Sequence, residues 1–281
     1  MKKKLSAGEM AGIIIGGIAV VLLLAAGFFA TVFTAVRWIM RQDQIGPVNE
    51  YSSTKEQLID APDDYSQAYM DQEYYEVFED AIRTDLDYQI DWDVYEYQGE
   101  YADKVSMTIS YPVITGDIDN LANINTAIQG EIEENEDLAE YIGGYLQEGD
   151  TYIFEADTFV TYMDQDVFSV IFMETATGLG WEEAYLISMN VDVRTGMVLN
   201  NNDLIDMDED FAVDFRTRND KQNGETETIT AMSDQEILSY LTDEDYGIAF
   251  YTPLGMEIGF NYPNGWLTVT YKDYQKYQKK F

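Results

Sequence analysis

The chain has 281 residues, of which 53 are acidic and 16 basic, and it contains neither cysteine nor histidine. Without these two residue types there is no thiol nucleophile, no disulfide framework, no Cys/His zinc site and no imidazole base. The net charge of −37 disfavours nucleic acid and attracts cations or basic proteins. Since 46% of the residues are hydrophobic and 14% aromatic, most of the chain is expected to fold.

The first predicted element is a transmembrane helix at residues 10–36, where no side chain is charged. About 20 apolar residues suffice to cross a bilayer at roughly 1.5 Å each. A cleaved signal peptide is the alternative, because Lys2–Lys4 form a basic n-region. The apolar run of a signal peptide is only roughly 7 to 15 residues long, so we expect an uncleaved anchor.

The flanking residues indicate how this helix is oriented. Lys2–Lys4 precede it, Arg37 and Arg41 follow it, and Trp38 fits an interfacial aromatic anchor. We expect a single-pass protein of the cell membrane. Its short N-terminal end, residues 1–9, is then inside, and its C-terminal domain is extracellular.

Gly12 and Gly16 within this helix have GxxxG spacing. Such spacing lets two helices approach closely and predicts a weak homodimer. Glycine is also common in spanning helices, which is the alternative reading.

The part beyond residue 41 carries 52 acidic and 11 basic residues, a net charge of −41. Outside the cell and without cysteine, its fold depends on a hydrophobic core alone. This is ordinary for a surface protein of a Gram-positive bacterium.

Residues 37–87 are predicted to form a juxtamembrane linker and a stalk helix. Residues 42–66 are polar and contain two prolines. From Gln67 to Asp87 the apolar side chains recur at three and four residues, as in an amphipathic helix. This helix is either a stalk or the first piece of the following domain.

Residues 88–281 are predicted to form one α+β domain, with an antiparallel meandering sheet packed with a few helices. Alternating apolar residues predict strands at 88–94, 105–111, 151–162, 167–175, 184–193, 197–199, 247–251, 256–262 and 267–271. Helical spacing predicts helices at 119–132, 138–146, 211–215 and 234–241, the first capped by Asp119. A polar loop is expected at 219–230.

Four motifs in this domain resemble one family. They are Tyr111-Pro-Val-Ile-Thr-Gly116 followed by Ile124-Asn125, Val167-Phe-Ser169-Val-Ile-Phe, the turn Asp192-x-x-Thr195-Gly196, and the closing segment from Phe250 to Pro263 with Val269-Thr-Tyr271. In order and spacing, over about residues 88–281, they are similar to the extracytoplasmic domain of RsiV-type lysozyme-binding anti-sigma factors.

The resemblance implies a binding role. In the best-studied branch of that family the domain binds lysozyme outside the cell, and binding licenses proteolysis that frees a sigma factor. Here only about nine residues precede the membrane helix. We therefore expect neither a cytoplasmic anti-sigma segment nor sigma-factor sequestration.

The closing hairpin of the family contributes to lysozyme contact, and the matching turn here offers Tyr262, Pro263 and Trp266 as ligand-binding residues. Their rings would make good anchors. The same residues are also ordinary constituents of turns and strands.

The acidic cluster of Asp203, Asp206, Asp208, Glu209 and Asp210 invites comparison with a calcium loop. However, Phe211 stands where an EF-hand has glycine, and the twelfth position lacks glutamate. A solvated helix N-terminus is the favoured interpretation. We assign neither metal nor cofactor.

The expected function is binding or sensing of a cationic extracellular protein such as lysozyme. The alternative is a wall-associated carbohydrate-binding or structural module, in which Tyr95, Tyr97 and Tyr101 stack on sugars. A carboxylate-based hydrolase ranks third, since two carboxylates about 5 to 9.5 Å apart would be required. Among 52 acids some pair always qualifies, so we assign no catalytic residue and expect no enzyme.

Overall fold

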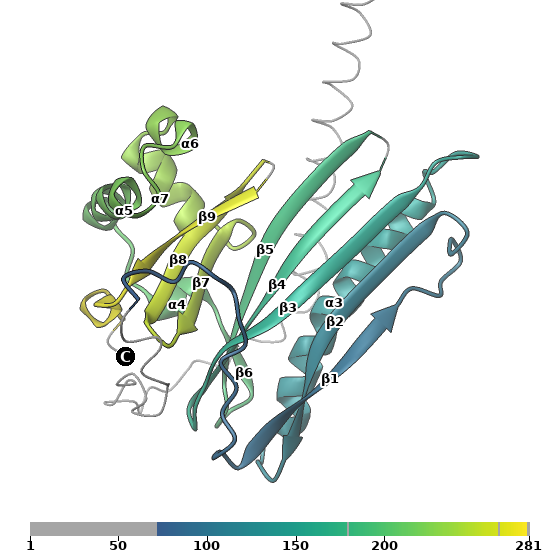
Figure 1. The fold of residues 1–281 in the computed structure, drawn as a ribbon, viewed down its shortest axis with the longest axis horizontal. Helices are drawn as coiled ribbons and strands as arrows, with labels where there is room; N and C mark the ends of the chain where they lie inside the picture. Colours follow the sequence, from purple (N-terminus) through teal and green to yellow (C-terminus); the bar gives the residue numbers. More distant parts are fainter. Residues whose placement is uncertain (1–71, 179, 264, 280–281) are drawn as a thin grey trace, which may run out of the picture. The chain divides into compact units, whose positions relative to one another are not determined.

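The computed structural model describes residues 72–178, 180–263 and 265–279, all within the unit Glu50–Phe281 (Figure 1). The predicted anchor at 10–36, its flanking residues and the Gly12/Gly16 motif lie outside these ranges. In the described ranges, no helix combines the length and the apolar character that crossing a bilayer requires.

A six-stranded sheet forms one half of the domain, in the order β1-β2-β3-β4-β5-β6 (Figure 1). Its strands are β1 (Tyr88–Glu96), β2 (Val105–Gly116), β3 (Tyr152–Met163), β4 (Val167–Gly178), β5 (Trp181–Asp192) and β6 (Met197–Leu199). The predicted hairpin of β3 and β4 is confirmed.

The prediction of an antiparallel meander is wrong at one point, because β2 and β3 run parallel. A parallel pair needs a crossover connection. The helix α3 (Leu121–Gly143) supplies it and packs on β2. The domain is therefore a sheet-dominated α+β fold with a mixed sheet.

This α3 is one helix where two were expected, and Asp119 does not cap it. The N-cap residue is Asn120, whose side chain makes no capping bond. Its amide donates instead to the main-chain oxygen of Arg194. The buried face of α3 contains Ile124, Ile128, Ile132, Leu138 and Ile142.

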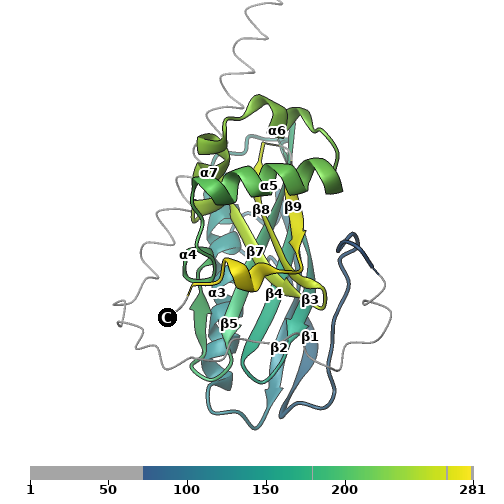
Figure 2. The same ribbon diagram turned by 90° about the vertical axis from the view of Figure 1, so that its left-hand side faces the viewer.

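The second half of the domain is a three-stranded antiparallel sheet, β7 (Gly247–Thr252), β8 (Gly255–Tyr262) and β9 (Gly265–Tyr271). The remaining helices are α4 (Asn201–Leu204), α5 (Glu209–Gln222), α6 (Glu227–Ala231), α7 (Asp234–Thr242) and a 3₁₀ turn at Tyr274–Lys276. Figure 2 shows α5 lying across β8 and β9. The closing strands are as predicted, whereas the expected polar loop contains α6.

The strands β2 and β3 separate beyond Ile109 and Ala156, where their pairing ends. Each then has an unpaired edge, whose main-chain groups need other partners. On β2, the amide of Asn125 forms two bonds of 2.8 Å with the main-chain N–H and oxygen of Ile114. An asparagine side chain thus takes the place of a strand.

On β3, the free edge is covered by residues 72–87, which we call the strap. The N–H of Ala81 donates to the oxygen of Val160 at 2.7 Å, and the carboxylate of Asp80 accepts from the N–H of Val160 at 2.9 Å. The strap contains no helix, so the stalk helix predicted for 67–87 is wrong over these residues. Its main chain bonds to strands rather than to itself.

Polar side chains join the two sheets. The amide of Asn190 on β5 donates to the oxygen of Ala249 on β7 at 2.7 Å, and Ser169 on β4 accepts from the N–H of Tyr251 at 3.3 Å. The amide of Asn261 on β8 bonds to both main-chain groups of Leu186. All three polar side chains are buried, and their bonds fix the relative position of the sheets within the domain.

Candidate binding groove

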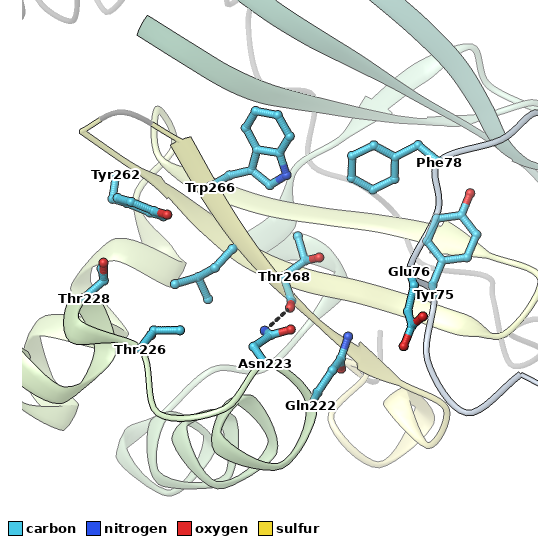
Figure 3. A pocket seen from close by; sticks show the side chains of 11 residues that line it. Tyr75, Glu76, Phe78, Gln222, Asn223, Thr226, Thr228, Tyr262, Trp266 and Thr268 are labelled. Atoms are coloured by element: carbon cyan, nitrogen blue, oxygen red, sulfur yellow. Dashed lines mark hydrogen bonds between the residues drawn. The ribbon is translucent and has the colours of Figure 1, made fainter.

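A groove of about 580 Å³ lies between the strap, β9 and the segment that joins α5 to α6 (Figure 3). Three distant stretches of chain build it. It is lined by Tyr75, Glu76, Phe78, Gln222, Asn223, Thr226, Thr228, Tyr262, Trp266, Leu267 and Thr268.

Aromatic contacts hold the strap side of the groove. Phe78 stacks on Trp266 with ring centroids 6.4 Å apart and 26° between the planes. The N–H of Tyr75 donates to the hydroxyl of Thr270 at 2.9 Å, and its ring meets Phe250 edge-on at 6.3 Å. Trp266 is thereby fixed in orientation, with part of its ring facing the groove.

The opposite side is tied to the outer edge of β9. The side chain of Gln222 accepts from the N–H of Thr270 at 2.9 Å, and Asn223 donates to the oxygen of Thr268 at 2.9 Å. The two residues end α5, and Asn223 is its C-cap. The end of the helix therefore covers the strand edge as another strand would.

Several polar groups along the groove lack a hydrogen-bond partner among the described residues. They are the hydroxyls of Tyr262 and Thr228, the indole N–H of Trp266 and the amide oxygen of Asn223. Glu76 is the one ionisable acid in the lining, and no basic residue contributes. The groove thus combines aromatic surface with uncharged donors and acceptors.

An ion pair lies where the strap begins. Lys221 contacts the carboxylate of Glu73 at 3.1 Å and lies over the ring of Tyr74 at 5.6 Å. The bond from Lys221 lowers the pKa of Glu73. Both side chains of the ion pair are exposed, so the pair contributes little to stability.

Two of the three residues predicted from the closing hairpin, Tyr262 and Trp266, line the groove. Pro263 is exposed in the adjoining turn and is not part of the lining. The residues missed by sequence reasoning come from the strap and from α5 and α6. No local pattern could have found them, because up to about two hundred residues of chain separate them from β9.

The tyrosines considered for sugar stacking lie elsewhere, around β1 and α3. Tyr97 is buried and donates to the carboxylate of Glu140 at 3.0 Å. The N–H of Tyr101 in turn donates to the Tyr97 hydroxyl at 3.3 Å. Burial, followed by a hydrogen bond with Glu136, raises the pKa of Tyr95. Tyr95 also lines a second hollow of about 450 Å³.

The acidic segment 203–210 is used to begin helices. The carboxylate of Asp208 accepts from the N–H of Phe211 at 2.9 Å and caps α5. Glu209 and Asp210 follow in its first turn, where their negative charges interact favourably with the positive end of the helix dipole.

Several motif residues behind the family resemblance have structural roles. Gly116 has a φ of +132°, and a Cβ there would lie 2.4 Å from the main-chain oxygen of Asp87. Asp192 accepts from the N–H of Arg194 at 2.9 Å and so closes the turn before β6. The motif residues Asn125 and Ser169 bond to strand edges, as described above.

Comparison with known proteins finds similarity at the level of solved structures. No family model matches the chain, and none of the curated proteins matches. A crystal structure of a DUF3298 family member from Bacteroides fragilis is similar with a TM-score of 0.46 at 12% identity, covering 68% of this chain and 94% of that one. A DUF3298 family protein from Pseudomonas aeruginosa PAO1 has a TM-score of 0.38 at 11% identity, with coverage of 72% and 96%. Both of these solved structures are DUF3298 family proteins.

Proposed function

We propose that the protein is a membrane-anchored, extracytoplasmic binding or sensing protein of a Gram-positive bacterium, with a domain of the RsiV type. Its ligand is a cationic protein, with lysozyme the first candidate. The anchor is the helix at 10–36, and the domain is outside. Its role is binding rather than catalysis.

The charge of the domain is the observation that carries this proposal. Residues 72–279 contain 45 acidic and nine basic side chains. Six of the basic ones, such as Arg216 with Asp234 at 2.7 Å, already lie in ion pairs with acids. The remaining acids produce a strongly negative field that would steer a basic protein to the surface.

The closing hairpin is the proposed contact. Pro263 is exposed at its turn, and Tyr262 beside it is half-buried. An aromatic ring held by a turn is a typical anchor in an interface. The stack of Trp266 on Phe78 anchors the hairpin to the strap.

The lining of the groove also supports binding. Hydrolysis of a glycosidic bond by the usual route needs a pair of carboxylates. The lining contributes a single one, Glu76, which is exposed.

Calorimetric titration of the full-length chain with lysozyme tests the proposal. We expect saturable one-to-one binding at physiological salt that persists at high salt, where charges further apart than about 3 to 8 Å are screened. A second small basic protein of similar charge serves as the control, and we expect no saturable binding of it to the chain.

A double substitution, Tyr262→Ala with Pro263→Ala, should weaken lysozyme binding at least tenfold. The matched control is Tyr145→Ala, because Tyr145 is 58% exposed and lies outside the hairpin. Equal binding of both basic proteins, or binding that disappears with salt, would reduce the acidic surface to unspecific electrostatics and refute the proposal.

A further inference from the structure

The groove between the strap and β9 differs in character from the surface around it. In a domain with 45 acidic side chains, its lining contains one carboxylate and no cation. Aromatic rings, uncharged polar groups and the side chain of Leu267 make up the rest. A site of this composition favours a ligand that is itself uncharged, because a negative charge finds no partner there and a positive charge finds only the exposed carboxylate of Glu76.

Polar groups and aromatic rings both contribute to the lining of this groove. Tyr262 lies on the side of the closing hairpin that faces Thr228 and Asn223, whereas the ring of Trp266 extends on the other side of β9, beside Phe78 (Figure 3). Four hydrogen-bonding groups of these residues have no partner within the described part of the chain. A purely apolar ligand would remove water from these groups without replacing its hydrogen bonds, and this desolvation would weaken binding.

An extended peptide is less suited to this groove. Peptides that add to a sheet need a free strand edge. Here the N–H of Thr270 and the oxygen of Thr268, on the outer edge of β9, are already bonded to Gln222 and Asn223. The strand edge is thus partly occupied by the protein itself.

We propose that this groove binds a neutral oligosaccharide of β-linked hexose units. Such sugars carry flat C–H faces that lie on aromatic rings, and hydroxyls at their rims that meet amide and hydroxyl groups. The volume of about 580 Å³ is in the range of small-molecule sites. The groove shares Tyr262 with the proposed lysozyme contact at the hairpin turn, but Thr228, Asn223 and Phe78 belong to the groove alone, so sugar binding does not depend on lysozyme binding.

Titration of the full-length chain with triacetylchitotriose and with cellotriose, in a detergent without a sugar headgroup, tests this proposal. Trp266 reports on the groove, so we expect a saturable change in tryptophan fluorescence that is insensitive to salt. If only triacetylchitotriose changes the fluorescence, the ligand is a chain of N-acetylhexosamine, as found in bacterial walls. If both sugars change it equally, the groove recognises the hexose rings. Absence of saturation with both sugars overturns the proposal.

Conservative variants locate the binding. Thr228→Val removes a hydroxyl and keeps the shape, and should weaken sugar binding roughly three- to tenfold, the usual effect of one lost hydrogen bond. Trp266→Phe should weaken it further while keeping a ring on Phe78; because this variant lacks the reporting indole, its sugar binding is measured by calorimetry. Thr108→Val and Trp92→Phe, exposed positions in β2 and β1, are the matched controls and should bind as the unchanged protein does.

Lysozyme titration of the same variants separates the two proposals. Thr228→Val leaves the hairpin turn intact, so lysozyme binding should be retained where sugar binding is weakened. Sugar binding that is unchanged in both groove variants would place the sugar elsewhere and overturn the assignment.

Discussion

Glu257 offers a quantitative test of how the two sheets meet. It lies in β8, opposite Thr270 on one side and Phe250 on the other, and it is fully buried. Within the described residues neither carboxylate oxygen meets a donor in hydrogen-bonding geometry. Desolvation raises the pKa of Glu257 from 4.5 to about 8, and the hydroxyls of Thr270 and Thr268 counteract only part of this.

The sign of the effect follows from proton uptake. Below pH 4.5 Glu257 is neutral in both states, and it does not destabilise the fold by ionisation. Between pH 4.5 and about 8 the unfolded chain ionises and the folded chain does not, so stability falls as pH rises. At about 1.4 kcal/mol per pH unit the full loss is roughly 5 kcal/mol, of which roughly 3 kcal/mol is reached at pH 7.

The substitution Glu257→Gln removes this dependence, because glutamine has the same shape and no charge to desolvate. Urea unfolding of the full-length chain, followed by tryptophan fluorescence from pH 4.5 to 8.5, measures it. The stability of the variant relative to the unchanged protein should rise by roughly 3 kcal/mol between pH 4.5 and 7. Glu76→Gln, on the exposed part of the strap, controls for the change in net charge. A stability difference that stays flat across this range would mean that Glu257 is hydrated, and the reasoning from burial would fail.

Three further predictions concern the strand edges. Asn125→Ala leaves the main chain of Ile114 without its two hydrogen bonds and should lower the free energy of unfolding, measured with urea, by about 2 kcal/mol. A decrease in this free energy of less than about 0.3 kcal/mol would show that water replaces the amide. Phe78→Ala should cost about 2 kcal/mol by opening the aromatic cluster, whereas Val77→Ala, at a position 67% exposed, should be nearly neutral. Gly116→Ala should cost about 1 to 3 kcal/mol through its positive φ and the close main-chain contact, and an unchanged melting temperature would contradict this.

Periodicity identified most elements of the domain because each has one buried face. The alternation in β3, β4 and β5 and the spacing in α7 reflect local burial, which a single segment of sequence records. Periodicity carries no information on which strands become neighbours. The parallel pairing of β2 with β3 was therefore missed, and the two short helical patterns of α3 were not joined.

The strap shows why a helical pattern can mislead. Its apolar residues Val77, Phe78 and Ala81 have helical spacing, yet Val77 is 67% exposed, whereas Tyr75, outside that pattern, is buried. The N–H groups of Tyr75 and Ala81 bond to β9 and β3 rather than to carbonyls four residues earlier. Tertiary contacts outweighed local propensity at this point.

The candidate groove was only half accessible to sequence reasoning. The resemblance of the closing hairpin to a lysozyme contact predicts Tyr262, Pro263 and Trp266 as ligand-binding residues, and two of these three line the groove. Their partners Phe78, Asn223 and Thr228 reach the groove through contacts over long sequence distances, which leave no local signature. The roles of all these residues in binding remain predictions that the titrations test.

The contacts of the strap also determine the order in which the domain can be completed. Tyr75 bonds to Thr270 and Gln72 to Lys272 across 195 and 200 residues of chain. Closing so long a loop is slow, and it cannot begin before β9 has been synthesised. Until then the inner face of β7 lacks the aromatic cover of Tyr75 and Phe78, and this exposed surface is prone to association. The contacts between the strap and β9 therefore form late in folding. The groove exists only after both segments have been synthesised and have come together.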